Sequence, residues 1–278
     1  MMFCDYHVHS EYSDDSLYLM KDIIKDAISM KMDEICFTDH VDYGIKLDWD
    51  DPALVIEPNI KVIANVNYPK YFQELEYLTK KYAKEIVIKK GIEFGVQMHT
   101  IKQYQSLFEQ YPFDFVILSI HEIDDQEFWT YDFQKGYSEA QYYQRYYQEM
   151  YDIIRNYHDY SVLGHLDLIK RYDNKDGYEA FKNHQDIIRD ILKYVIEDGK
   201  GIELNTSSIR YGLDDLMPSR DILKLYHDLG GKIITIGSDS HEPAHLGAHI
   251  EAMKKELKEI GFKEYCTFDK MKPIFHQL

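Results

Sequence analysis

The chain has 278 residues, of which 45% are hydrophobic and 29% are charged, and this length is enough for one large hydrophobic core. Its formal net charge of -17 repels nucleic acid and anionic membranes, although bound divalent cations would reverse the field locally and admit a small anionic substrate. Cys4, Cys36 and Cys266 have no metal-site spacing, and their odd number argues against a disulfide framework. No apolar run reaches the roughly 20 residues of a membrane span, and no signal segment opens the chain, so we expect a cytoplasmic protein with reduced thiols.

Seven short apolar or β-rich runs alternate with longer amphipathic stretches along the chain. Most of these runs lack clean alternation of apolar and polar residues, which is typical of strands that are buried on both faces. In chain order, the predicted strands lie in residues 2–7, 34–40, 86–95, 113–121, 161–167, 201–206 and 232–241.

The amphipathic stretches between the runs predict helices. Ser138 and Gln141 form a capping-box pattern, Pro69 suits the first turn of a helix, and Gly230-Gly231 predicts a helix end. The tyrosines that follow Ser138 at helical spacing are predicted to pack rather than to carry chemistry. The predicted helices cover residues 16–30, 69–84, 138–157, 177–197, 219–229 and 243–260.

Strands that alternate with helices predict a closed or nearly closed β/α barrel, with residues 1–278 as a single domain. An open doubly wound sheet is the competing architecture. Residues 41–68, which include Pro52 and Pro58, form a long excursion after the second strand. This excursion either covers a site or is a passive insertion.

Ligand-type side chains gather at the ends of the predicted strands. In a β/α barrel these ends point to one face, where the loops build the site. A single histidine at a strand end is more often a hydrogen-bonded core group than a ligand, but six histidines together with two carboxylates favour a metal site. In chain order, the strand ends carry His7, His9, His40, Glu93, His121, His165, Asn205-Thr206, Asp239 and His241.

The spacing of these residues has a physical reason. His7 and His9 are two residues apart on a strand, so both imidazoles project from the same side and can grip one divalent ion. Glu93 has two oxygens and can bridge two ions. The aspartates that follow "HVHS", together with His40 and His241, leave enough ligands for a third ion.

Two arginines beside these strand ends indicate recognition of an anion. Arg171 follows "LDLIK" and Arg210 ends "NTSSIR". The planar guanidinium group matches phosphate oxygens in a bidentate way that lysine does not. Pairing of each arginine with surface acids is the alternative.

The motifs "HVHSEYSDDS", "FTDH", "GIEFG", "SIHEID", "GHLDLIKRY", "NTSSIR" and "GSDSH" together resemble the PHP (polymerase and histidinol phosphatase) family, in its monofunctional histidinol-phosphate phosphatase branch. The resemblance extends from Asp5 to His241 and implies a distorted (β/α)7 TIM-like barrel with a trinuclear centre of divalent metal ions, which are Zn, Mn or Fe. The branch often has glycine at the position of Ser208.

Carried over position by position, the resemblance implies three ligand sets that share Glu93 between the first two ions. It favours Asp15 over the adjacent Asp14 as a ligand of the third ion, and it matches Arg171 and Arg210 to the residues that hold the substrate phosphate. The sets are His7, His9, Glu93 and Asp239 for the first ion, Glu93, His121 and His165 for the second, and Asp15, His40 and His241 for the third.

The implied reaction is hydrolysis of L-histidinol phosphate to L-histidinol and phosphate, a step of histidine biosynthesis. Asp239 and His241 are the expected catalytic residues, with Asp167 and a water molecule as further candidates for the general acid. The ammonium and imidazole groups of this substrate require acidic neighbours, for which Glu122, Asp124 and Asp42 are hypotheses. A small phosphate ester is therefore the expected partner.

Three other functions remain open at this point. A PHP phosphoesterase that acts on nucleotides or short oligonucleotides would share the metal ligands, although the acidic charge argues against long nucleic acid. An amidohydrolase-type C–N hydrolase also begins with HxH on a barrel, but it usually has a bridging carbamylated lysine where this chain has Glu93. A non-catalytic metal-binding module would bind metal without hydrolysis.

Overall fold

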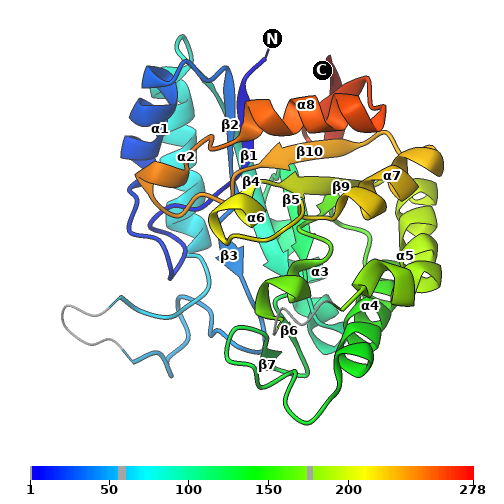
Figure 1. Ribbon diagram of the computed structural model, residues 1–278. Helices are drawn as coiled ribbons and strands as arrows, with labels where there is room; N and C mark the ends of the chain where they lie inside the picture. The colour runs from blue at the N-terminus through cyan, green and yellow to red at the C-terminus, as the bar shows by residue number, and fades with distance from the viewer. Residues whose placement is uncertain (1, 56–60, 174–177) are drawn as a thin grey trace.

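Seven parallel strands form the sheet at the centre of the molecule (Figure 1). The computed structural model describes residues 2–55, 61–173 and 178–278. The strands pair in the order β1-β2-β4-β5-β8-β9-β10, so all the predicted strands are confirmed. Their bounds are β1 Cys4–Val8, β2 Glu34–Phe37, β4 Val87–Gly95, β5 Phe115–Ser119, β8 Val162–Leu163, β9 Gly201–Asn205 and β10 Ile234–Gly237, with a short β3 His40–Val41 that also pairs with β4.

The sheet closes on itself where β1 meets β10. A bridge pairs Val8 with Ser240, and the backbone N–H of His9 donates to the carbonyl oxygen of Ser240 at 2.8 Å. The barrel is distorted, because β8 is only 2 residues long and the register of β1 against β2 shifts between Asp5 and Val8. This closure confirms the predicted seven-stranded barrel and excludes the open doubly wound sheet.

Helices cover the outside of the barrel, with α4 packed against α5 on one flank and α1 and α2 on the other (Figure 1). Five of the six predicted helices are confirmed to within a few residues, although residue 177, the predicted start of α5, lies outside the described residues. Among the described residues, no helix has the length and apolar character needed to cross a bilayer. The helices are α1 Met20–Ser29, α2 Tyr68–Tyr82, α3 Ile101–Gln110, α4 Glu139–Asn156, α5 Ala180–Glu197, α6 Ser207–Arg210, α7 Arg220–Asp228 and α8 Ile250–Ile260.

Two helical regions differ from the predicted ones. The prediction of one helix over residues 243–260 is wrong, because His249 adopts a φ of 62° and separates the 3-10 turn Pro243–His245 from α8. Helix α3 is not among the predicted helices, although Ile101, Tyr104 and Leu107 recur at helical spacing; its N-cap residue Thr100 makes no side-chain cap. Helix α3 is held instead by tertiary packing of Ile101, Tyr104 and Leu107, which are buried.

The tyrosine-rich helix α4 packs as predicted. Its capping box is present, with Ser138 and Gln141 bonded to each other's backbone. Tyr143, Tyr146 and Tyr147 are each at most 1% exposed, and the hydroxyl of Tyr146 donates to the carbonyl oxygen of Leu166 at 3.1 Å. The phenol of Tyr146 therefore ties α4 to the segment after β8, which carries His165.

Two antiparallel hairpins, one at each end of the barrel, are not among the predicted elements. Strands β11 Glu264–Asp269 and β12 Lys272–Gln277 pair near the amino ends of the barrel strands, where the backbone N–H of Phe268 donates to the hydroxyl of Tyr6 at 2.8 Å. Strands β6 Glu122–Ile123 and β7 Gln126–Glu127 follow β5 at the carboxyl ends, where the site lies.

The described part of the excursion over residues 41–68 reaches the carboxyl face. Lys46 forms ion pairs with Asp14 at 2.7 Å and with Asp42 at 2.8 Å, and Asn65 accepts the backbone N–H of Asp42 at 2.8 Å. Residues 56–60, which include Pro58, lie outside the described residues. Lys46 lines the cavity described below, so at least this part of the excursion is a wall of the site.

Candidate metal centre

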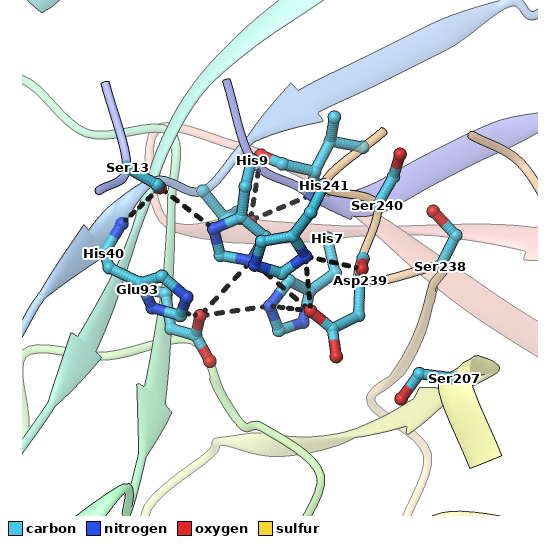
Figure 2. A network of polar contacts seen from close by, with 12 residues as sticks. His7, His9, Ser13, His40, Glu93, Ser207, Ser238, Asp239, Ser240 and His241 are labelled. Carbon is cyan, nitrogen blue, oxygen red and sulfur yellow. Dashed lines mark hydrogen bonds and ion pairs between the residues drawn. The ribbon is translucent and has the colours of Figure 1, made fainter. Parts of the chain in front are cut away.

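The carboxyl ends of the strands converge on one polar cavity of about 470 Å³, and Figure 2 shows His7, His9, His40, Glu93, Asp239 and His241 directed toward one another. These side chains come from β1, β3, β4 and the segment after β10. His7, His9 and Glu93 are 0% exposed, and Glu93 lines the cavity. The structure brings together all nine ligand candidates, which are His7, His9, Asp15, His40, Glu93, His121, His165, Asp239 and His241.

Glu93 lies at the centre, and its Oε2 oxygen faces three imidazoles. The Nε2 of His7 is 3.1 Å from this oxygen, the Nδ1 of His40 is 3.0 Å away, and the Nε2 of His9 is 3.5 Å away. One oxygen of a fully buried carboxylate thus contacts side chains from two other strands.

The Oε1 oxygen of Glu93 faces a second group. The Nε2 atoms of His165 and His121 are 2.9 Å and 3.2 Å from it, and the hydroxyl of Ser119 donates to it at 2.6 Å. The two oxygens of Glu93 therefore serve two separate sets of histidines, which is the arrangement required of a carboxylate that bridges two ions.

Asp239 completes the set around the two histidines of β1. Its Oδ1 lies 3.8 Å from the Nε2 of His7 and 3.5 Å from the Nε2 of His9. The backbone of Asp239 has a φ of 57°, a conformation that is uncommon outside glycine and here turns the carboxylate into the cavity.

The neighbouring aspartates Asp14 and Asp15 point in different directions. Asp15 Oδ2 lies 3.1 Å from the Nε2 of His241 and 3.5 Å from the Nε2 of His40. Asp14 is instead paired with Lys46 at 2.7 Å. The geometry therefore favours Asp15 as the ligand candidate, because Lys46 neutralises Asp14.

The donor set fits divalent cations. Within the described residues, the buried ring nitrogens His9 Nε2 and His165 Nδ1 have no hydrogen-bond partner, and an unpaired buried nitrogen is costly unless a ligand compensates it. Imidazoles combined with carboxylates suit Zn, Mn and Fe. Ligand atoms converge within 4.8 Å in several groups, among them His7, His9 and Asp239; His7, Glu93 and His165; and His9, His40 and His241.

Charge compensation shifts the pKa values of these side chains. Burial alone would raise the pKa of Glu93, but the imidazoles of His7, His40 and His121 hold it well below its ordinary value. Burial would lower the pKa of His121, yet Glu93 and Asp42 raise that pKa to about 10. The carboxylates thus attract positive charge strongly, which is what a cation-binding site requires.

Further carboxylates and hydroxyls orient the histidines from behind. The Nδ1 of His121 is 2.8 Å from Asp42, and the Nδ1 of His9 is 3.2 Å from the hydroxyl of Ser13, which itself donates to Asp39. Such contacts fix the ring and the tautomer that a metal ligand presents. Asp42 therefore orients His121. It also lines the cavity, so its role as an acidic neighbour of the substrate stays a prediction.

The two arginines lie on the far side of Asp239 from the histidines. The Nη2 atoms of Arg171 and Arg210 are 3.3 Å and 3.5 Å from its Oδ2, and the ring of Tyr211 lies under both guanidinium groups, 4.0 Å from the Cζ of Arg171. Arg210 also donates to the backbone carbonyls of Ser238 and Asp239, each at 2.7 Å. Both arginines therefore pair with the buried Asp239, and the alternative that they pair with acids on the surface does not hold.

Two other candidates lie away from the cavity. Asp167 accepts from Lys170 at 2.7 Å and from the backbone N–H of Ser219 at 2.9 Å, and it does not line the cavity. Asp124 is exposed and paired with Arg145 at 3.2 Å. The structure therefore does not support Asp167 as a general acid or Asp124 as a neighbour of the substrate.

Sequence comparisons identify relatives over nearly the whole chain. Residues 5–207 match the PHP domain family. A histidinol-phosphatase from Lactococcus lactis subsp. lactis (strain IL1403) is 34% identical over 274 residues, which are 96% of this chain and 95% of that protein. A protein named a probable histidinol-phosphatase from Thermotoga maritima is 28% identical over 271 residues, which are 97% of each chain.

A solved structure has the same architecture. The crystal structure of histidinol phosphate phosphatase from Lactococcus lactis subsp. lactis Il1403, complexed with zinc, L-histidinol and phosphate, matches with a TM-score of 0.83. The two chains are 31% identical, and the match covers 98% of each. The likeness therefore includes β10 and the C-terminal hairpin as well as residues 5–207.

The central position of Glu93 leads to a prediction. We expect Glu93→Gln to weaken metal binding by roughly 100-fold or more, because an amide offers one weaker oxygen where the carboxylate offers two. The measurement is the metal content of dialysed protein by elemental analysis, with circular dichroism to establish that the variant is folded. A folded variant with the metal content of the wild type would contradict the central role of Glu93.

Proposed function

The chain belongs to the PHP domain family, and we propose that it is a metal-dependent phosphomonoesterase that hydrolyses L-histidinol phosphate to L-histidinol and phosphate. The relative that is 34% identical is named a histidinol-phosphatase, and the solved structure holds zinc, L-histidinol and phosphate. The observation that carries the proposal is a single cavity in which Arg171 and Arg210 meet a buried histidine and carboxylate cluster at Asp239.

We propose three divalent cations, which are Zn, Mn or Fe. Glu93 is proposed to bridge the first two, because its oxygens face separate histidine sets. When bound, such cations supply Lewis-acid charge for the phosphoryl group and acidify a water molecule. The proposed ligands are His7, His9, Glu93 and Asp239 for the first, Glu93, His121 and His165 for the second, and Asp15, His40 and His241 for the third.

The arginines are proposed to hold the phosphoryl group in different ways. The buried Nε of Arg171 has no hydrogen-bond partner among the described residues, so it is available for a phosphoryl oxygen. The Nη atoms of Arg210 are engaged by the backbone at residues 238 and 239, so Arg210 also positions Asp239. Both supply positive charge where charge accumulates during phosphoryl transfer.

Asp239 and His241 are the proposed catalytic residues. The Nδ1 of His241 lies 2.9 Å from the backbone oxygen of Asp239, so the two side chains are held in a fixed relation. The Asp239 carboxylate lies between the histidines and the arginines. Burial would raise its pKa, but these neighbours hold that pKa well below its ordinary value, so its oxygens can accept a proton during the hydrolysis.

The other end of the cavity is proposed to bind the amino alcohol. Glu122 is 2% exposed, and its Oε1 has no partner among the described residues. Glu127 lies opposite Glu122 in the β6–β7 pairing, and Trp129 lines the same cavity. Two carboxylates beside an aromatic ring suit a substrate that carries an ammonium and an imidazole group.

A cytoplasmic location and a single domain over residues 1–278 are also part of the proposal. Cys4, Cys36 and Cys266 are buried and free, which suits a reducing compartment. Asp239 and His241 lie beyond the matched residues 5–207, yet they complete the site, so we treat the chain as one unit.

The activity and the phosphate site are tested together. We expect the metal-loaded protein to release phosphate from L-histidinol phosphate, and Arg171→Ala and Arg210→Ala each to lower kcat/KM by about 100-fold or more. Arg171→Lys should restore only part of the loss, because an ammonium lacks the planar fork. Arg155→Ala, on the surface of α4, is the control, and an unchanged kcat/KM for either site variant would remove that arginine from the phosphate site.

Specificity gives a separate prediction. Glu122→Gln should raise KM for L-histidinol phosphate by about 10-fold or more, because a charge-assisted contact with the substrate cation is lost. With p-nitrophenyl phosphate, which carries no cationic group, the kcat and KM of Glu122→Gln should stay close to those of the wild type. Asp124→Asn is the matched control. An equal effect on both substrates would mean that Glu122 does not recognise the alcohol. If the wild-type protein hydrolysed adenosine monophosphate faster than L-histidinol phosphate, the proposed substrate would be wrong.

A further inference from the structure

A buried carboxylate that belongs to none of the proposed ligand sets lies directly behind the metal centre. Glu203 is in the middle of β9, is 0% exposed, and points into the barrel between two neighbouring strands. An acidic side chain in the apolar strand "GIELN" is costly to bury unless its oxygens are bonded.

Both oxygens of Glu203 contact ligand candidates. Its Oε1 lies 2.6 Å from the Nδ1 of His7. Its Oε2 accepts the backbone N–H of His165 at 2.9 Å and the side-chain amide of Asn205 at 3.2 Å. One carboxylate therefore contacts a proposed ligand of the first ion and the backbone of a proposed ligand of the second.

The neighbouring strand β10 leaves room for this carboxylate. A Cβ added at Gly237, in β10, would lie 2.6 Å from the Oε1 of Glu203 and 2.3 Å from the Cβ of His7. Strand β9 lies beside β10, so the absence of a side chain at Gly237 lets Glu203 reach His7.

We propose that Glu203 is a positioning residue that holds the first and second metal sites in register. By accepting the Nδ1 proton of His7, it fixes the tautomer in which Nε2 faces Glu93 and Asp239, and its charge raises the basicity of that nitrogen. By accepting the N–H of His165, it holds a residue whose φ of 21° is unusual for a side chain with a Cβ.

This role differs from that of the other residues behind the histidines. Asp42 contacts one ligand candidate, His121, and its charge is shared with Lys46 at 2.8 Å. In the part of the chain that the structure describes, the ion pair of Glu203 is with His7, and no lysine or arginine dilutes its charge. The negative charge of Glu203 is therefore paired with His7 alone among the charged side chains of the described residues.

The inference rests on the metal centre of the proposed function, and its test uses metal binding rather than turnover. Glu203→Gln keeps the shape of the side chain but places an amide where three N–H groups donate. We expect zinc affinity, measured by titration of metal-free protein against a chelating dye, to fall by about 10- to 100-fold. The absorption bands of the cobalt-substituted protein should also shift, and Glu203→Asp should restore part of the affinity.

The matched control is Glu34→Gln. Glu34 is also a buried strand glutamate, 5% exposed, but it lies at the amino end of β2 and bonds the hydroxyl of Tyr6. The variant Glu34→Gln should lower the free energy of unfolding measured in urea, without a change in zinc affinity. Wild-type zinc affinity and an unshifted cobalt spectrum for folded Glu203→Gln would overturn the proposal, as would an equal loss in Glu34→Gln. A wild-type protein that binds zinc but does not hydrolyse L-histidinol phosphate would instead contradict the proposed function.

Discussion

The burial of one charged carboxylate, Glu93, is the constraint on which the site depends. It is 0% exposed at the centre of the barrel, where an uncompensated charge would be prohibitive. Among the described residues, its oxygens contact imidazoles on both sides, which can carry positive charge, and one hydroxyl, which donates a hydrogen bond. Apolar side chains cannot compensate this charge. The histidines that surround Glu93 are therefore a consequence of its burial.

The barrel makes this compensation possible. Parallel strands place their carboxyl ends on one rim, so residues as far apart in the chain as His7 and Asp239 approach within 3.8 Å. The rim is then divided by Asp239, whose Oδ1 faces the histidines and whose Oδ2 faces Arg171 and Arg210. A phosphate ester that lies across Asp239 would therefore meet the metal side and the guanidinium side together, with the acidic pair Glu122 and Glu127 beyond.

Much of the fold could be predicted because the local signals agree with the tertiary structure. The buried strands are short apolar runs, and α4 carries both a capping box and a tyrosine face that packs. Elements held mainly by tertiary contacts have weaker local signals: α3 has helical apolar spacing but no side-chain cap, and β12 is largely exposed and depends on its pairing with β11. The break at His249 follows from a left-handed backbone residue that no sequence pattern marks.

The candidate site was predictable where ligands end strands or belong to a family motif, as Asp15, Arg171 and Arg210 do. Glu203 lies in mid-strand, so reading the strand ends overlooks it, although an acid in an apolar run is a signal of its own. The choice between Asp14 and Asp15 depends on Lys46, which approaches from the excursion and is remote in sequence. Asp124 and Glu122 are near neighbours in the β6–β7 hairpin, yet only Glu122 is buried at the cavity. The sequence alone does not show which of the two side chains points into the cavity.

The most direct test of the account is anomalous diffraction at the zinc absorption edge from crystals of the zinc-loaded protein. The account predicts three peaks in the cavity, two of them on either side of Glu93 and the third beside Asp15 and His241. A single peak, or peaks spread over separate surfaces with Glu93 bound to none of them, would contradict it.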